Sequence, residues 1–228
     1  MIRSLFDFIF PPLCLNCRSA VGSHETVCES CFKTIDTQKT LFCGRCRARL
    51  PENKKICHSD FPYLLGAACS YENPAIRNLI RGLKFKFFKD ASLPLAFLLI
   101  AYVEQLKILK GDWLIIPIPL GKRRLRQRSF NQSELIARIF ADHFGLPLET
   151  DALIRAKETR PQSELKNPDE RANNIKGCFA VADPQKISGR NIILIDDVVT
   201  SGATFLEAAT FLKIAGAQKI IALAVAKS

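Results

Sequence analysis

The sequence lacks an apolar stretch long enough to cross a membrane. A spanning helix needs about 20 consecutive apolar residues, and the nearest candidate, residues 93–108, is interrupted by Glu104, Gln105 and Lys107. The first ten residues contain an arginine, an aspartate and no small-residue cleavage site, which argues against a signal peptide. We expect them to form a short helix that packs its apolar side chains on the body of a cytoplasmic protein.

Acidic residues are the minority among the charged ones. The chain has 33 Lys and Arg against 22 Asp and Glu, a net charge of +11. Residues 1–60 hold nine basic and six acidic residues, and residues 61–228 hold 24 and 16, so most of the excess lies in the larger part. This balance favours anionic partners such as nucleic acid, phosphorylated metabolites or acidic lipid. A basic protein without a polyanionic partner is the plainer alternative.

Apolar residues are scarce between residues 13 and 60, where seven of the nine cysteines lie. In the cytoplasm such cysteines are more often metal ligands than disulfides. Cys14-x-x-Cys17 and Cys28-x-x-Cys31 together predict one structural zinc site, with redox or incidental thiols as the alternative. Metal binding would supply the folding free energy that this segment cannot gain by burial. Four protein ligands leave no open position for catalysis.

A second cysteine set is incomplete. Cys43-x-x-Cys46 and Cys57 provide three sulfurs, and the position that would complete a second pair is Asp60. Either His58 or Asp60 would complete a tetrahedron, because both residue types bind zinc. A degenerate site without metal is the alternative. The sequence therefore predicts one zinc ion and leaves a second open.

From residue 61 onward, strand-like runs alternate with helical patterns. The expected strands are residues 64–71, 113–118, 192–195 and 220–225, and the expected helices are residues 74–83, 91–109, 133–144 and 204–215. Residues 157–177 are polar and aperiodic, so we expect a mobile loop. Cys69 and Cys178 fall in apolar runs and are predicted to be buried. This alternation predicts an α/β domain over residues 61–228, a parallel sheet with helices on both faces, preceded by a cysteine-rich zinc-ribbon module over residues 1–60.

The segment 192–204 carries the clearest chemistry. A buried strand ends in two carboxylates, and a loop of small residues then opens a helix, whose backbone N–H groups and nearby hydroxyls suit a phosphate. The glycine allows close approach of the backbone, and the carboxylates suit ribose hydroxyls, with Mg²⁺ as a candidate companion. An acidic cap on an ordinary helix is the alternative. The candidate phosphoribosyl-binding residues are Asp196, Asp197, Thr200, Ser201, Gly202, Ala203 and Thr204.

This segment resembles the phosphoribosyl-diphosphate (PRPP) signature of type I phosphoribosyltransferases. The resemblance implies a central parallel sheet with a hood and a mobile loop over the active site. Purine-salvage members carry an acidic residue three positions after the second acid, where this chain has Thr200. Base-catalysed purine salvage is therefore not implied, and no catalytic residue is assigned.

A wider resemblance covers almost the whole chain. The cysteine pairs, the phosphoribosyl loop and several intervening motifs are similar to the ComF (ComFC) family. The intervening motifs are Tyr71-Glu72, Leu83-Lys84-Phe85, residues 116–119, residues 124–132, residues 159–163, Arg171, Asn174 and Gly177. That family is implicated in natural competence, the uptake and processing of transforming DNA. Single-stranded DNA and other competence or recombination proteins are thus candidate partners.

Two basic runs contain no acidic residue. Residues 122–128 hold five cations at the place where the resemblance implies pyrophosphate contacts, and arginine binds phosphate oxygens bidentately. Residues 77–89 hold five cations interleaved with phenylalanines, a pattern that suits single-stranded DNA unless those rings face the core. The candidate pyrophosphate or DNA contacts are Arg123, Arg124, Arg126, Arg128, Lys84 and Lys86.

Two functions remain open at this point. One is a competence-type DNA-processing protein that binds single-stranded DNA and a phosphoribosyl group. The other is an active phosphoribosyltransferase that uses PRPP and Mg²⁺ with an unknown acceptor. The basic runs and Thr200 favour the first, and the intact pair of aspartates favours the second.

Overall fold

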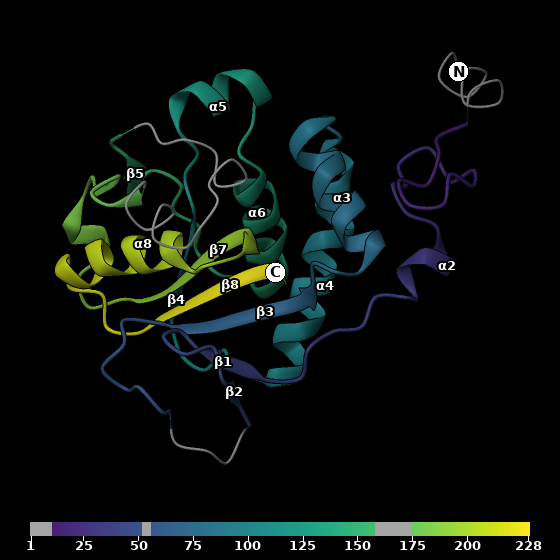
Figure 1. The fold of residues 1–228 in the computed structure, drawn as a ribbon. Coiled ribbons are helices and arrows are strands. Elements are labelled where there is room, and N and C mark those ends of the chain that lie inside the picture. The colour runs from purple at the N-terminus through teal and green to yellow at the C-terminus, as the bar shows by residue number, and fades with distance from the viewer. Residues whose placement is uncertain (1–10, 52–55, 158–174) are drawn as a thin grey trace.

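The computed structural model describes residues 11–51, 56–157 and 175–228. The helix expected within residues 1–10 and nearly all of the loop expected over residues 157–177 lie outside these ranges. A six-stranded sheet with the order β2-β1-β3-β8-β7-β4 forms the centre of the molecule (Figure 1). Its parallel strands are β3 (Leu64–Ser70), β8 (Ile220–Lys227), β7 (Asn191–Val199) and β4 (Trp113–Pro117).

Helices cover both faces of this sheet, as predicted. One face packs against α3 (Pro74–Phe85), α4 (Ser92–Leu106) and α6 (Gln132–Phe144), and the other against α8 (Ala203–Ile214). Strand β7 contributes side chains to the hydrophobic cores on both faces of the sheet, because successive side chains of a strand point to opposite faces. Ile193 and Ile195 lie in the first core, and Ile192 and Leu194 lie in the second.

Shorter elements complete the described fold. A two-stranded antiparallel sheet of β5 (Leu153–Arg155) and β6 (Phe179–Val181) lies on the α8 side. The others are α2 (Glu29–Phe32), α5 (Lys122–Arg128), η1 (Lys89–Ala91) and η3 (Pro184–Lys186). Among the described residues, no helix combines the length and the apolar composition that a bilayer crossing requires.

Two boundaries differ from the sequence prediction by three or more residues. The helix expected to reach residue 109 ends at Leu106, where Lys107 adopts a left-handed backbone with φ 51°. Strand β7 does not stop at Ile195 but runs through both aspartates to Val199, because β8 continues beside it as far as Lys227. Asp196 and Asp197 therefore lie on the sheet, and the connecting loop to α8 shrinks to residues 200–202. Cys69 and Cys178 are both 1% exposed, as predicted.

The cysteine-rich module divides between two places. Its first half lies beside α3, where a Cβ on Gly82 would come within 2.6 Å of the Leu15 side chain, so the glycine permits close contact. The second half contributes β1 (Leu41–Cys43) and β2 (Arg49–Leu50) to the main sheet, and β1 pairs antiparallel with β3. Strand pairing thus crosses the boundary predicted after residue 60, and the division of the chain at that residue stays a prediction.

Candidate functional site

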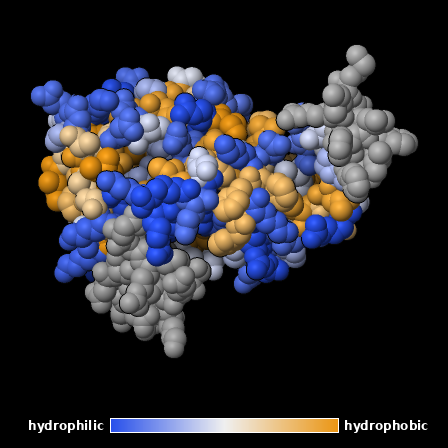
Figure 2. All heavy atoms as spheres, turned by 90° about the horizontal axis from the view of Figure 1, so that it is seen from above, coloured by the Kyte–Doolittle hydropathy of each residue, from blue (hydrophilic) through white to orange (hydrophobic). Residues whose placement is uncertain are grey.

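A cavity of about 930 Å³ opens at the carboxyl ends of β4 and β7, between α3 and α5. Ligands of parallel α/β sheets bind at this edge. Seen from the α5 side, hydrophilic residues surround scattered apolar ones on this end of the molecule (Figure 2). The charged and hydroxyl-bearing residues of the lining are Tyr71, Arg81, Lys84, Arg123, Arg124, Arg128, Ser133, Arg155, Asp196, Asp197, Thr200, Thr204 and Ser228.

At the floor of the cavity, Asp197 forms an ion pair with a lysine from α3. The carboxylate is 2% exposed, and its Oδ2 lies 2.7 Å from Nζ of Lys84. Lys84 was predicted to contact pyrophosphate or DNA, and it does line the cavity. Its ammonium also neutralises a buried carboxylate where strand and helix meet, and its contact with pyrophosphate or DNA stays a prediction. A phosphate approaching Lys84 must share it with Asp197.

The neighbouring Asp196 has a different environment. Its Oδ1 accepts hydrogen bonds from Oγ of Ser133 at 2.7 Å and from the backbone N–H of Asp197 at 2.9 Å. Burial, and next the negative charge of Asp197, raises the pKa of Asp196 to about 7. This carboxyl group therefore exchanges its proton near neutral pH. It accepts hydrogen bonds from a ligand when ionised and donates one when protonated.

The loop at residues 200–202 leads into α8 through a glycine with φ 73°. Only glycine adopts such a backbone without strain. A Cβ on Gly202 would lie 3.0 Å from the hydroxyl of Tyr63, so the glycine also permits close contact with this side chain. Burial raises the pKa of Tyr63 to about 12, which keeps its hydroxyl protonated. The hydroxyl donates to the Gly202 carbonyl at 3.4 Å.

Only part of the predicted phosphate loop lines a cavity. Thr200 and Thr204 line the large cavity, and together with Gly202 and Asp196 they line a smaller hollow beside it. Ser201 and Ala203 line neither hollow. The hydroxyl of Ser201 instead accepts from the backbone N–H of Ala203 at 3.4 Å, inside the turn.

The basic run 122–128 forms helix α5, so its arginines point in different directions. Arg123, Arg124 and Arg128 line the cavity, whereas Arg126 does not, and neither does Lys86 of the other basic run. Arg128 donates to Oε1 of Gln132 at 2.9 Å and lies 5.6 Å from the centre of the Phe85 ring. Of the six predicted pyrophosphate or DNA contacts, the cavity thus brings together four.

Several lining residues had not been predicted from the sequence. Arg81 lies three residues before Lys84 on α3, so helical spacing would have placed both on one face. Ser133 is the second residue of α6, two positions after Asn131, whose side chain caps that helix, and its role follows from the fold alone. Arg155 lies on β5 and no local motif marks it.

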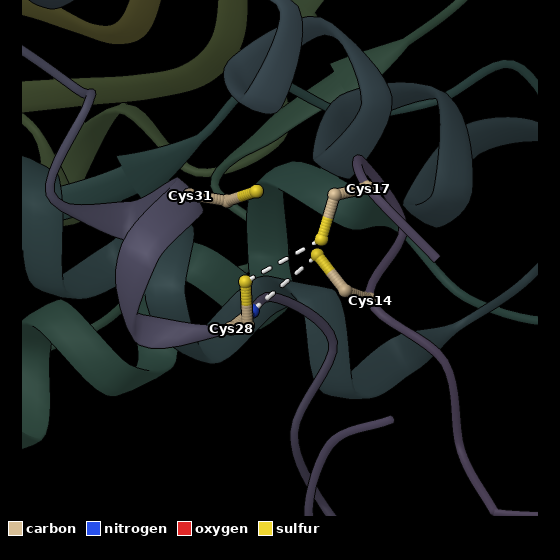
Figure 3. A group of neighbouring side chains, drawn as sticks. All are labelled: Cys14, Cys17, Cys28 and Cys31. Carbon is tan, nitrogen blue, oxygen red and sulfur yellow. Dashed lines mark hydrogen bonds between the residues drawn. The ribbon is translucent and has the colours of Figure 1, made fainter. Parts of the chain in front are cut away.

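The four cysteines of the first set converge on one point (Figure 3). Their sulfur atoms lie within 4.8 Å of one another, and those of Cys17 and Cys28 are 3.6 Å apart. Tetrahedral zinc with bonds of about 2.3 Å separates its sulfurs by about 3.8 Å. The backbone N–H of Cys28 donates to the sulfur of Cys14 at 3.4 Å, and Asn16 donates to that of Cys31 at 3.2 Å. Such outer hydrogen bonds orient metal ligands, so this set fits zinc.

The ligand atoms of the second cysteine set also converge on one point. Cys43, Cys46, Cys57 and His58 place their ligand atoms within 4.8 Å of one another, whereas Asp60 is not part of the group. The sulfur of Cys43 lies 3.4 Å from Nδ1 of His58, and those of Cys46 and Cys57 are 3.4 Å apart. Of the two candidates for the fourth ligand, the geometry favours His58. A Cys₃His set is a recurring structural zinc site.

Comparison with known proteins finds matches both for the cysteine-rich segment and for the segment that contains the aspartate pair and the loop before α8. The family model of the double zinc ribbon domain matches residues 5–59, and that of the phosphoribosyl transferase domain matches residues 131–228. DNA utilization protein YhgH of Escherichia coli (strain K12) is 29% identical over 92% of this chain and 94% of its own length. Competence protein F of Haemophilus influenzae is 28% identical over 91% and 93%. Competence protein ComFC of Bacillus subtilis is 33% identical over 53% and 47%.

Proposed function

Because the chain belongs to the ComF family of competence proteins, we propose that it processes DNA in natural transformation. In this proposal it binds single-stranded DNA on the rim of the cavity and a phosphoribosyl group on the cavity floor. The observation that carries the proposal is the cavity itself, whose lining joins the loop before α8 to a rim of arginines and phenylalanines. A volume of about 930 Å³ lies at the upper end of the range for small-ligand sites, so it accommodates a nucleotide.

The aromatic part of the rim supports DNA binding. Phe85, Phe87 and Phe88 are 62%, 49% and 48% exposed, so these rings are not the core-facing set that the sequence left open. Exposed clusters of large apolar side chains mark interaction surfaces. Bases of single strands stack on such rings, and the neighbouring Arg81, like Arg128 over Phe85, suits the backbone phosphates.

The floor supports the phosphoribosyl part. Thr200 and Thr204 face the hollow at the start of α8, where the helix dipole and the backbone N–H groups of the first turn favour a phosphate. Asp196 lies beside them and suits a ribose hydroxyl. Mg²⁺ prefers carboxylate and phosphate oxygens. Because Lys84 already neutralises Asp197, we expect such an ion to enter together with the pyrophosphate.

The second candidate function is phosphoribosyl transfer from PRPP to an unknown acceptor, and the aspartate pair favours it. In that case Arg123, Arg124 and Arg128 would stabilise the leaving pyrophosphate by charge-assisted hydrogen bonds. Asp196 would hold a ribose hydroxyl, and Thr200 would leave the site without an acidic residue at the position of the salvage base. The acceptor, which is the nucleophile, would then have to react without a base at position 200 to take its proton.

Oligonucleotide binding separates the two functions. Fluorescence anisotropy with a short single strand at several salt concentrations should give a steep salt dependence, since each phosphate contact releases a counterion. Arg124→Ala should weaken binding and flatten the slope by about one contact, whereas Arg126→Ala, on the same helix but outside the cavity, should change the slope less. Phe85→Ala should lower affinity by about 1–3 kcal/mol without changing the slope. Phe97→Ala is the control, because that ring is 49% exposed on α4 and outside the cavity lining.

Titration calorimetry with PRPP and Mg²⁺ tests the floor independently. The proposal expects binding to the parent protein. PRPP turnover without oligonucleotide binding near physiological salt would replace the DNA-processing proposal with the transferase. Absence of both would contradict the assignment of the cavity.

A further inference from the structure

We propose that the second metal site positions the phosphate loop through Arg47, so that metal bound by Cys43, Cys46, Cys57 and His58 orders residues 200–202. The phosphate role of this loop rests on the proposed function, but the mechanical link does not. The structure joins the two places directly, because the guanidinium of Arg47 donates a hydrogen bond to the backbone carbonyl of Ser201, 154 residues away.

The position of Arg47 is set by the cysteine knuckle. Arg47 follows Cys46 and adopts a left-handed backbone with φ 59°, which is unfavourable for a residue with a side chain. Its N–H donates to the carbonyl of Cys43 at 2.9 Å, and the N–H of Cys43 donates to that of Ala48 at 2.9 Å. A strained backbone persists only where its surroundings hold it. Metal coordination by Cys43 and Cys46, which both precede Arg47, would supply that constraint.

A second contact, made by Tyr63, also joins the loop at residues 200–202 to the cysteine knuckle. Tyr63 donates to the carbonyl of Gly202, and its ring lies 5.2 Å from that of Phe61. Phe61 in turn packs against Gly44 of the knuckle, where a Cβ would come within 2.7 Å of the Phe61 ring and 2.4 Å of the Tyr63 carbonyl. The knuckle therefore supports two successive loop carbonyls, one through Arg47 and one through the Phe61–Tyr63 packing.

Because the peptide group is planar, these contacts with carbonyl groups also fix the direction of the loop N–H groups. In a planar trans peptide the carbonyl and the following N–H point in opposite directions. Holding the carbonyl of Ser201 toward the knuckle turns the N–H of Gly202 away from it. The carbonyl of Gly202 also accepts the first hydrogen bond of α8, from the N–H of Leu206 at 2.9 Å, and the N–H of Ala203 donates to the Ser201 hydroxyl at 3.4 Å. The N–H of Gly202 is therefore the donor at the start of α8 that Arg47 orients for an anion. Arg47 is thus a positioning residue for an anion-binding backbone, and does not itself contact the ligand.

Hydrogen–deuterium exchange tests the link without any ligand. In Arg47→Ala, and in Cys57→Ser, the amides of residues 200–206 should exchange roughly 10-fold faster than in the parent protein, because a charge-assisted hydrogen bond is lost. Arg49→Ala is the matched control. Arg49 belongs to the same module, but its guanidinium contacts Gln38, 3.4 Å away on the surface. Elemental analysis should show that Arg47→Ala keeps the zinc content of the parent and that Cys57→Ser loses one equivalent.

Ligand binding gives the second readout. Titration of ribose 5-phosphate should show roughly 10-fold weaker binding to Arg47→Ala and unchanged binding to Arg49→Ala. By reciprocity the same ligand should slow zinc release from the second site to a chelator. Unchanged loop exchange in both Arg47→Ala and Cys57→Ser would overturn the proposal, whether or not the loop binds phosphate. Faster loop exchange in a protein that binds no ribose 5-phosphate would retain the link and reject the proposed function.

Discussion

The two cysteine sets are similar in sequence but lie against different parts of the proposed phosphoribosyl site. The first is packed on α3, where Asn16 accepts a hydrogen bond from Asn78 at 3.0 Å and Thr34 accepts one from Asn73 at 2.8 Å. The second is continuous with the central sheet and contacts the loop before α8. One set therefore contacts the helix that carries Arg81 and Lys84, and the other contacts the loop at residues 200–202. A duplicated cysteine motif thus borders two walls of one cavity.

The largest effect that distinguishes the two sets should come from removing one ligand from each. A structural zinc contributes an apparent binding free energy on the order of 10 kcal/mol. Cys28→Ser should lose one zinc equivalent and become protease-sensitive within residues 13–36, while Cys57→Ser should lose one and become sensitive within residues 44–58. Limited proteolysis with mass spectrometry and elemental analysis measures both. A parent protein free of zinc, prepared without chelator, would contradict the account of both sites.

On the α3 side, the next largest effect should come from Lys84. Removing its ammonium leaves the buried carboxylate of Asp197 without its ion-pair partner, which typically costs about 3–5 kcal/mol. Lys84→Met should therefore lower the free energy of unfolding by that amount in urea titrations. Lys86→Met is the control, because Lys86 is exposed and such changes usually stay within about 0.5 kcal/mol. Equal stabilities of the two variants would show that the ion pair is not formed.

On the loop side, Gly202→Ala should have a smaller but more specific effect. The left-handed backbone costs a residue with a side chain about 1–2 kcal/mol, and the new Cβ would also press on the Tyr63 hydroxyl. Gly145→Ala isolates the first contribution, since Gly145 has φ 62° and nothing within 4 Å of the added atom. Both variants should lose stability, but only Gly202→Ala should weaken binding of ribose 5-phosphate. If Gly202→Ala binds ribose 5-phosphate as tightly as the parent protein does, the loop does not belong to the binding site.

Asp196 lies between the two walls, and its titration gives an effect that depends on pH. Its pKa in the folded protein is about 7, above the value of about 3.9 in an unfolded chain. Between these values the folded state holds a proton that the unfolded state has lost, so stability contributed by this group is present below pH 4 and is lost as the pH rises to 7. The difference in unfolding free energy between the parent and Asp196→Asn should change across that window and level off above it. A constant difference would show that Asp196 titrates normally.

Periodicity and spacing were enough to predict much of this architecture. Alternating apolar segments predicted the strands at residues 113–118 and 220–225 and the covering helices, because burial of one face or of both leaves a regular pattern. The C-x-x-C pairs predicted the first metal site for the same reason, since ligand spacing is local. The choice of His58 over Asp60 required the fold.

The features that were missed depend on contacts between distant segments. The extension of β7 through Asp196 and Asp197 is imposed by its neighbour β8, so no local propensity indicates it. The pairing of Lys84 with Asp197 and the reach of Arg47 to Ser201 join residues more than 100 positions apart. Likewise, only the helical form of residues 122–128 separates the cavity-lining Arg124 from Arg126.

The central claim is that the DNA-binding rim and the phosphoribosyl floor form one site. It is tested most directly by measuring the affinity for a fluorescent single-stranded oligonucleotide with and without saturating PRPP and Mg²⁺ at constant ionic strength. The account predicts weaker oligonucleotide binding in the presence of PRPP, because both ligands would use the cavity-lining Arg123, Arg124 and Arg128. Oligonucleotide affinity that is independent of bound PRPP would contradict it.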